Sequence, residues 1–170
     1  MKTRSLIISM LVLALAACTA PPPDETDTPD VPKVEMAEVT IYFMDEARFS
    51  VGTEPYEVGV IREFHPDAFL PRLALQAYFD GPTEEEAAQG LAQILSRCTG
   101  FSDLQVEDGI ARVYLTGPCS SGGSTYTIAA PIMKTLKQFD EIEYVKHYDA
   151  AAGTEPPFGP SDSIPFVLEP

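Results

Sequence analysis

The sequence predicts an α+β domain in which two main helices pack on a small, mostly antiparallel sheet. Three patterns predict it: β-branched and aromatic runs, an Asp-Gly pair between two alternating stretches, and apolar residues that recur every three or four positions. Within residues 37–149 the approximate order is β-β-α-α-β-β-α-β. The 170 residues, 45 % of them hydrophobic, supply apolar material for one core.

The N-terminus is predicted to be an export signal rather than part of the fold. Lys2 and Arg4 precede an apolar run over residues 6–17, which is too short for a permanent membrane span. The motif Leu-Ala-Ala-Cys that ends at Cys18 resembles the bacterial lipobox, in which the thiol accepts diacylglycerol. We expect residues 1–17 to be removed and lipid on Cys18 to hold the protein to a membrane outside the cytoplasm. The alternative is an ordinary signal peptide followed by a chance cysteine.

Residues 18–36 are predicted to be a solvated tether. They hold five prolines and five acidic residues and show almost no apolar periodicity. The acidic stretch 24–30 lacks the glycine and the terminal glutamate that a calcium loop needs, so a spacer is the favoured interpretation.

The first two strands are predicted over residues 38–44 and 56–64. Both stretches are rich in β-branched and aromatic residues, and a turn region around Gly52 and Pro55 separates them. We expect the first strand to be central and to pair with the second as a hairpin.

Two helices follow. Apolar residues between Phe69 and Tyr78 recur at helical spacing, and Gly81-Pro82 ends the pattern. Thr83 and Glu86 have the spacing of a capping box, which predicts a short helix that ends at Gly90. The alternative is that the three adjacent glutamates form a metal or acid/base site. Capping is favoured because carboxylates in the first turn also suit the helix dipole.

Asp108-Gly109 predicts a two-residue hairpin loop. The resulting register pairs Val106 with Ala111, and continued outward it places Cys98 opposite Cys119. Opposed strand residues of this kind lie within disulfide distance. We expect this disulfide, although unbroken strand geometry is not expected to reach the two cysteines. Two free buried thiols are the alternative, and a redox-active pair is disfavoured because no Cys-x-x-Cys spacing is present.

A last helix, a closing strand and a tail complete the chain. Pro131 lies within the apolar stripe of the helix, so either it occupies the first turn or the helix kinks there. Ser124 and Thr125 are candidate caps. Residues 142–148 alternate as a strand, and residues 150–170 are rich in proline and glycine. Four apolar residues suggest that the end of this tail docks on the core: Ile164, Phe166, Val167 and Leu168.

These motifs together resemble the GerMN domain, named from sporulation and spore-germination proteins. The resemblance covers roughly residues 38–149. It implies a small α+β domain found in envelope-anchored lipoproteins, without a catalytic residue set. A related domain takes part in a channel complex between two membranes, and its fold is similar to the ring-building motifs of secretion systems. The residues that carry the resemblance are Val39-Thr40-Ile41-Tyr42-Phe43, Arg62, Gly81-Pro82-Thr83 with Glu86, Gly90-Leu91, Asp108-Gly109, and Thr135-Leu136-Lys137-Gln138-Phe139 before Val145.

The residues themselves also indicate a protein that is not an enzyme. The formal net charge of −15 disfavours nucleic-acid binding. His65 and His147 lie at no metal-ligand spacing, so we expect surface or partly buried imidazoles and no metal, cofactor or catalytic residues. The segment 120–124, Ser-Ser-Gly-Gly-Ser, reads as a flexible connector; the alternative is an anion cradle before a helix.

We therefore expect a lipid-anchored module for protein–protein assembly in the cell envelope, with an exposed sheet edge or helix face as the contact surface. The alternative is binding to peptidoglycan or another envelope glycan, and a small hydrolase is a remote third class. An exposed cluster of three tyrosines would favour the glycan, and an apolar exposed strand edge would favour assembly. The tyrosines are Tyr42, Tyr56, Tyr78, Tyr114, Tyr126, Tyr144 and Tyr148.

Overall fold

A computed structural model describes residues 35–170, and the predicted signal peptide, the lipidation site Cys18 and most of the tether lie outside them. No helix in this part of the chain is long and apolar enough to cross a membrane. The elements in chain order are β1 (Ala37–Asp45), α1 (Glu46–Val51), β2 (Glu57–Phe64), α2 (Leu70–Asp80), α3 (Glu84–Ala88), β3 (Leu91–Ala92), β4 (Gly100–Glu107), β5 (Ile110–Thr116), α4 (Ala129–Leu136), β6 (Tyr144–Tyr148) and the 3-10 helix η1 (Phe166–Leu168).

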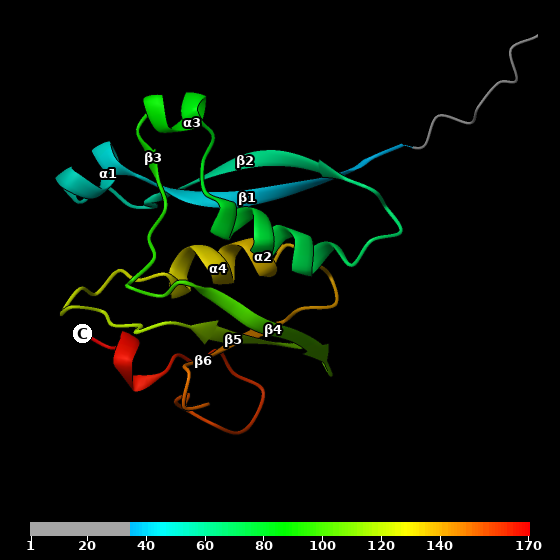
Figure 1. Cartoon of the computed structure of the whole chain (residues 1–170), viewed down its shortest axis with the longest axis vertical. Coiled ribbons are helices and arrows are strands. Elements are labelled where there is room, and N and C mark those ends of the chain that lie inside the picture. The colour runs from blue at the N-terminus through cyan, green and yellow to red at the C-terminus, as the bar shows by residue number, and fades with distance from the viewer. Residues whose placement is uncertain (1–34) are drawn as a thin grey trace, which may run out of the picture. The chain divides into compact units, whose positions relative to one another are not determined.

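The α+β class is confirmed, but the strands form two sheets where the sequence suggested one. The strand orders are β2-β1-β3 and β4-β5-β6, and α2 and α4 lie between the two sheets (Figure 1). The two sheets stay separate because α4 occupies the edge of β1 that β3 leaves open. The Tyr42 amide donates to Thr135 Oγ1 over 3.1 Å, and Gln138 accepts from the Thr40 amide and donates to its carbonyl over 2.8 and 2.6 Å.

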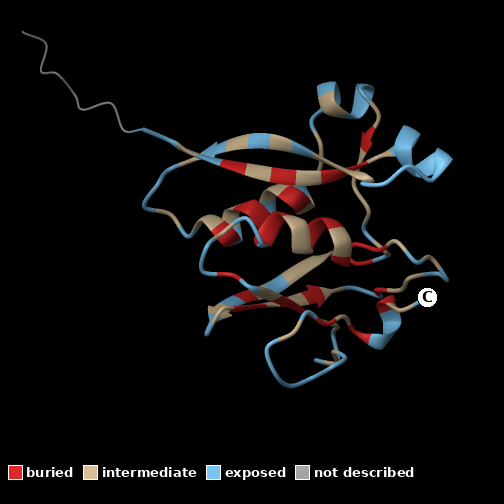
Figure 2. Cartoon of the chain, turned by 180° about the vertical axis from the view of Figure 1, so that it is seen from behind, coloured by how far each residue is buried: buried red, intermediate tan, exposed pale blue. Residues whose placement is uncertain are grey.

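The predicted β1–β2 hairpin is confirmed, with β1 as the central strand. Its register pairs Ile41 with Val60 and Phe43 with Val58 in antiparallel fashion. Alternate side chains of β1 are buried, and the Phe43 ring stacks on that of Tyr78 in α2 at 5.7 Å between centroids. Figure 2 shows that buried residues gather where the sheets and helices face one another.

Helix α1 was not predicted. Asp45 caps its start by accepting from the Arg48 amide over 3.0 Å, and Gly52 ends it in the left-handed region with φ of 70°. The helix buries none of its residues, so it has no apolar stripe from which periodicity could predict it.

Helices α2 and α3 follow the prediction closely. Pro71 lies in the first turn of α2 and Gly81 ends that helix. The capping box of α3 is complete: Thr83 Oγ1 accepts from the Glu86 amide over 3.2 Å, and the Glu86 carboxylate accepts from the Thr83 amide over 2.9 Å.

In the second sheet the predicted β4–β5 register holds near the turn, where Val106 pairs with Ala111 and Leu104 with Val113. A bulge between Phe101 and Asp103 then shifts it by one residue. Strand β6 joins β5 in parallel, because α4 carries the chain back across the sheet between them.

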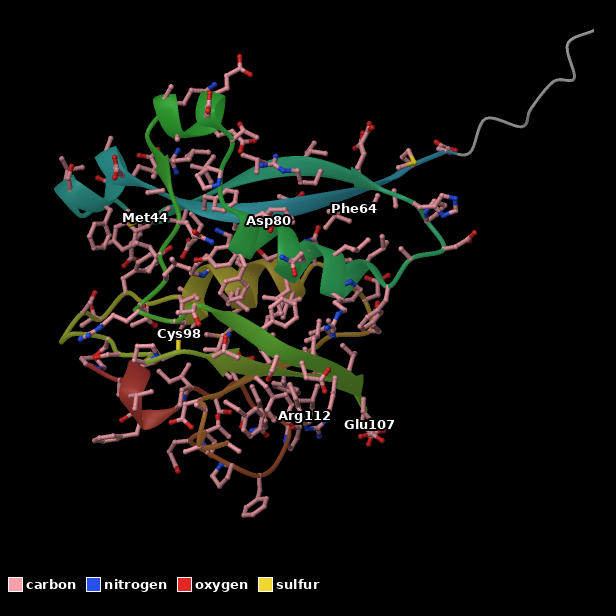
Figure 3. All side chains as sticks on the ribbon, viewed as in Figure 1. Met44, Phe64, Asp80, Cys98, Glu107 and Arg112 are labelled. Atoms are coloured by element: carbon pink, nitrogen blue, oxygen red, sulfur yellow. A yellow bond between two sulfur atoms is a disulfide. The ribbon has the colours of Figure 1, made fainter. Side chains whose placement is uncertain are left out.

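The structure joins Cys98 to Cys119 by a disulfide, the pair that the sequence indicates, although not through the predicted strand pairing. Strand β4 begins at Gly100 and β5 ends at Thr116, so both cysteines lie beyond the ladder. Their Cα atoms are nevertheless 4.3 Å apart (yellow bond in Figure 3). The closure of the hairpin end, rather than its register, therefore brings them together.

Helix α4 begins late enough for Pro131 to lie in its first turn, so no kink is needed. Its N-cap is Ile128, not Ser124 or Thr125, and it has no side-chain cap.

The C-terminal tail docks on the core through fewer residues than expected. Leu168 is 1 % exposed, whereas Phe166 is 81 % exposed and Val167 also faces solvent. A single helical turn cannot bury three consecutive side chains against one surface.

Candidate interaction surface

The sheet edges of this protein differ in how many of their backbone N–H and C=O groups are already hydrogen-bonded or covered. An open edge presents N–H and C=O groups that can pair with another chain. The edge of β1 is closed by β3 and α4, as described above. Strand β3, at the outer side of that sheet, is only two residues long, and short edge strands offer little backbone to pair with. The longer edge strands are β6, β4 and β2.

The edge of β6 is closed by the C-terminal tail. The His147 amide donates to the Ser163 carbonyl over 2.9 Å, and the Ser163 amide donates to the Val145 carbonyl over 3.1 Å. Asp162 Oδ1 accepts from the Val145 amide over 2.9 Å. The tail therefore stands where a further strand would pair.

The edge of β4 is protected by its own irregularity. The bulge beside Asp103 bends the strand, and Asp103 Oδ1 accepts the Leu104 amide over 2.9 Å. The Gln105 side chain and the Arg72 guanidinium hold the same carboxylate at 2.9 and 3.5 Å. A bulge and a fixed charge are common means of keeping an edge strand from pairing.

The edge of β2 is open along a regular strand. The Asp45 amide donates to the Tyr56 carbonyl over 2.8 Å, so the even-numbered residues of this segment bond to β1. The N–H and C=O groups of the odd-numbered residues, Glu57, Gly59, Ile61 and Glu63, consequently point away from it. In the described part of the chain β2 pairs with β1 alone (Figure 1). The Ile61 carbonyl accepts only from the neighbouring Arg62 side chain, over 3.2 Å.

Gly59 leaves the middle of this edge bare. A Cβ at this position would lie 2.5 Å from Thr40 Cγ2 and 3.2 Å from the Tyr42 ring, so neighbouring side chains fill the space that a side chain would need. Ile61, two residues along the same face, is 60 % exposed. The edge thus combines unpaired backbone with an exposed apolar side chain.

An ion pair fixes β2 to α3 on the other face. Arg62 donates from Nη1 and Nη2 to the two Glu86 carboxylate oxygens over 2.7 and 2.6 Å. These bonds, with the Thr83 amide, lower the pKa of Glu86 to about 2. The strand that carries the open edge is therefore held in place before any partner arrives.

Comparison with known proteins identifies the family. The model of the Germane family, described as sporulation and spore germination, matches residues 40–146, which is more than half of the chain. The chain belongs to the Germane family. The expected resemblance to the GerMN domain is thereby confirmed.

Two solved structures are similar to this Germane chain, both of the sporulation protein GerM from Bacillus subtilis. Its first GerMN domain is 20 % identical, with a TM-score of 0.48, over 78 % of this chain and 96 % of that one. The tandem GerMN domains are 18 % identical, with a TM-score of 0.49, over 68 % of this chain. The alignment spans 39 % of the tandem protein. No curated protein matches the sequence.

One of the two histidines of the Germane domain differs from the expectation. His65 is exposed as predicted, but His147, expected at the surface or partly buried, is fully buried. Its burial lowers the pKa to about 4. The prediction was wrong because the tail covers the edge of β6, a contact over 16 residues that strand alternation does not reveal. Within residues 35–170 no three His, Cys, Asp or Glu side chains gather to hold a metal ion.

The Ser-Ser-Gly-Gly-Ser segment is a clamp for the tail rather than an anion cradle. The Ser121 amide donates to the Val167 carbonyl over 2.8 Å, and its hydroxyl donates to the Glu169 carbonyl over 2.6 Å. The Gly122 and Gly123 amides donate to the Ser120 and Ser121 hydroxyls, so these amides are not free to bind an anion.

The tyrosines do not form the exposed cluster that glycan binding would require. Tyr78 is buried and the other six are half-buried. The rings that do gather are those of Tyr56 and Tyr126 with Phe49 of α1, and a second pair, Tyr114 and Tyr148, stacks at 4.9 Å. No sequence pattern predicted the first group, because α1 itself carried no signal.

Proposed function

We propose that this chain is a lipid-anchored, non-enzymatic module outside the cytoplasm that joins a protein assembly in the cell envelope, with a role in sporulation or germination. It binds its partner by accepting an extended segment along the open edge of β2. The observation that carries this proposal is that β2 presents unpaired backbone groups on a long regular strand, whereas the edges of β6 and β4 are closed or protected and β3 is only two residues long.

The open edge supplies both affinity and register. Outward N–H and C=O groups of four alternate residues can bond to an added strand, and Ile61 gives it an apolar contact. Each backbone hydrogen bond contributes about 1 kcal/mol net. Because β2 is tied to α3 through Arg62 and Glu86, little ordering is left to oppose binding.

The charge of the chain favours a basic partner. Glu57 and Glu63 flank the centre of the edge, and the formal net charge is −15. A partner strand that carries Lys or Arg would meet complementary charge, which speeds encounter. Lipid on Cys18 and the tether of residues 18–36 would hold the edge near envelope partners.

The edge is tested by crosslinking in intact cells. A photoreactive amino acid at Glu63 captures the partner, in chains that carry wild-type Ile61, Ile61→Pro or the matched control Ile61→Thr. Proline removes only the outward-pointing N–H of residue 61, and its ring blocks the approach of a partner strand. Threonine keeps this N–H and is β-branched like isoleucine. We expect the main crosslinked protein to fall roughly tenfold with proline and to remain with threonine.

Equal thermal unfolding of the variants shows that the fold is retained. A crosslinked product that proline leaves unchanged would contradict docking at this edge. Capture of no protein, together with sedimentation of the chain with isolated peptidoglycan, would instead favour the glycan alternative.

A further inference from the structure

A hollow of about 490 Å³ lies at the end of the first sheet. It is lined by residues on both sides of the start of β2, namely Glu54, Pro55, Tyr56 and Glu57, and by Tyr126 and Ala130 at the start of α4. In Figure 3 this end of the sheet is marked by Met44, the β1 neighbour of Glu57.

Two tyrosine rings, those of Tyr56 and Tyr126, line the hollow with their centroids 5.4 Å apart. The ring of Phe49 packs against both, at 5.3 Å from Tyr56 and 5.6 Å from Tyr126. Tyr56 and Tyr126 meet edge to face at 87°. Aromatic faces carry negative electrostatic potential, so such rings attract cations.

The polar groups at the surface of the hollow are carboxylates. The Glu57 side chain is 13 % exposed, and Glu54 adds a second carboxylate at the rim. The Tyr126 hydroxyl is buried beside Glu57, and burial, followed by the charge and hydrogen bonding of Glu57, raises the pKa of Tyr126. The lining therefore carries two carboxylates and no basic side chain.

The chain already holds one cation in this manner. Lys134 Nζ lies 3.4 Å from Glu57 Oε2 and 4.9 Å from the centre of the Tyr42 ring. A carboxylate can accept several hydrogen bonds, so Glu57 keeps capacity for a further donor. A carboxylate beside a tyrosine face is therefore a working cation site in this protein.

We propose that the hollow binds a cationic side chain, an ammonium or guanidinium on an aliphatic stem, presented by a basic peptide. The stem would lie against the Tyr56 and Tyr126 rings, and the cation would donate to the carboxylates of Glu57 and Glu54. An anion would be repelled by Glu54 and Glu57, and a neutral apolar side chain would form neither a hydrogen bond nor an ion pair with them. Binding in the hollow requires no strand pairing at the edge of β2, so either this proposal or the proposed function can fail while the other holds.

The test is a titration of the full chain in detergent with a small probe molecule. Binding is monitored by NMR of isotope-labelled tyrosine rings. The probes are Nα-acetyl-lysine methylamide and its neutral counterpart Nα-acetyl-norleucine methylamide. We expect saturable shifts of Tyr56 and Tyr126 with the lysine probe, at an affinity at least about tenfold above that of norleucine. Ile61→Pro should leave this binding unchanged.

Two variants locate the site. Glu57→Gln, which removes the charge, and Tyr126→Leu, which removes the ring, should each weaken lysine binding about fivefold or more, whereas the matched controls Glu63→Gln and Tyr148→Leu should not. Unchanged ring shifts of Tyr114 in the two pocket variants show that the fold is intact. Equal binding of the two probes, equal shifts at all tyrosines, or no binding would overturn the proposal.

Discussion

At the residue scale, Glu86 shows how one side chain serves two structures. Its spacing from Thr83 predicts a helix cap, and that prediction is confirmed. The same carboxylate binds Arg62, which is 24 residues away in the sequence. A three-residue spacing can be read locally, but the ion pair exists only because the fold lays α3 beside β2. The cap therefore also fixes the strand that presents the open edge.

Stability should fall in two separate pH ranges as the solution is acidified. Buried His147 has a pKa lowered from 6.5 to about 4, because the interior disfavours its charged form. The unfolded chain therefore binds the proton first, and stability is lost between about pH 6.5 and 4. Glu86, whose pKa is lowered from 4.5 to about 2 by Arg62, adds a second loss between these two values.

Glu86→Gln tests the lower range, because the amide keeps the cap but cannot titrate. We expect it to reduce the free energy of unfolding at pH 7 by about 1–3 kcal/mol and to flatten the loss below pH 4.5. The loss between pH 6.5 and 4 should be unchanged, and urea unfolding at a series of pH values measures both. Glu85→Gln on the same helix is the control. If the free energy of unfolding of Glu86→Gln falls below pH 4.5 as steeply as that of the wild type, the ion pair contributes little to stability.

At the element scale, the C-terminal tail closes the edge of the second sheet at β6. It covers β6 through Ser163, is clamped by Ser121 and inserts Leu168 into the core. The disulfide between Cys98 and Cys119 closes the loops next to this clamp, since the Ser120 amide donates to the Ser96 carbonyl over 2.8 Å. Composition indicated a loose tail, and its four apolar residues indicated docking. The hydrogen-bonded contacts decide where it docks.

Docking of the tail is tested by two substitutions in the same helical turn. Leu168→Ala should lower the free energy of unfolding by about 2–4 kcal/mol, because a buried leucine is replaced by a cavity. Phe166→Ala removes a larger side chain that is 81 % exposed, and it should change stability by less than about 0.5 kcal/mol. Thermal and urea unfolding measure both. Equal effects would mean that the turn does not pack as described.

At the scale of the whole molecule, the negative net charge opposes the membrane attachment that we propose. Removal of residues 1–17 would take away Lys2 and Arg4 and shift the formal net charge from −15 to −17. Such a charge would give no electrostatic attraction to anionic lipid, so the membrane attachment that we propose would depend on the acyl chains. A tether of about 18 residues rich in proline would then hold the domain tens of ångströms from the bilayer.

Lipidation is tested by metabolic labelling of cells with palmitate. The wild-type chain should incorporate the label and should be extracted from membranes only by detergent. Cys18→Ser should lose the label, because a hydroxyl cannot form the thioether, while the neighbouring Thr19→Ser should keep it. Incorporation of label into Cys18→Ser, or its absence from the wild type, would exclude the anchor at this position.

The elements that could be predicted from the amino-acid sequence are those whose signals are local. The β1–β2 hairpin, the Pro71 and Gly81 boundaries of α2, the capping box and the Asp108-Gly109 turn each depend on residues a few positions apart. The tertiary structure alone decided the split into two sheets, the burial of His147, the Arg62–Glu86 pair and the aromatic hollow beside α1. Each depends on packing between segments distant in the chain, which periodicity and propensity do not encode. The open edge of β2 belongs to this second group, because a strand edge is open only when no other segment of the folded chain pairs with it.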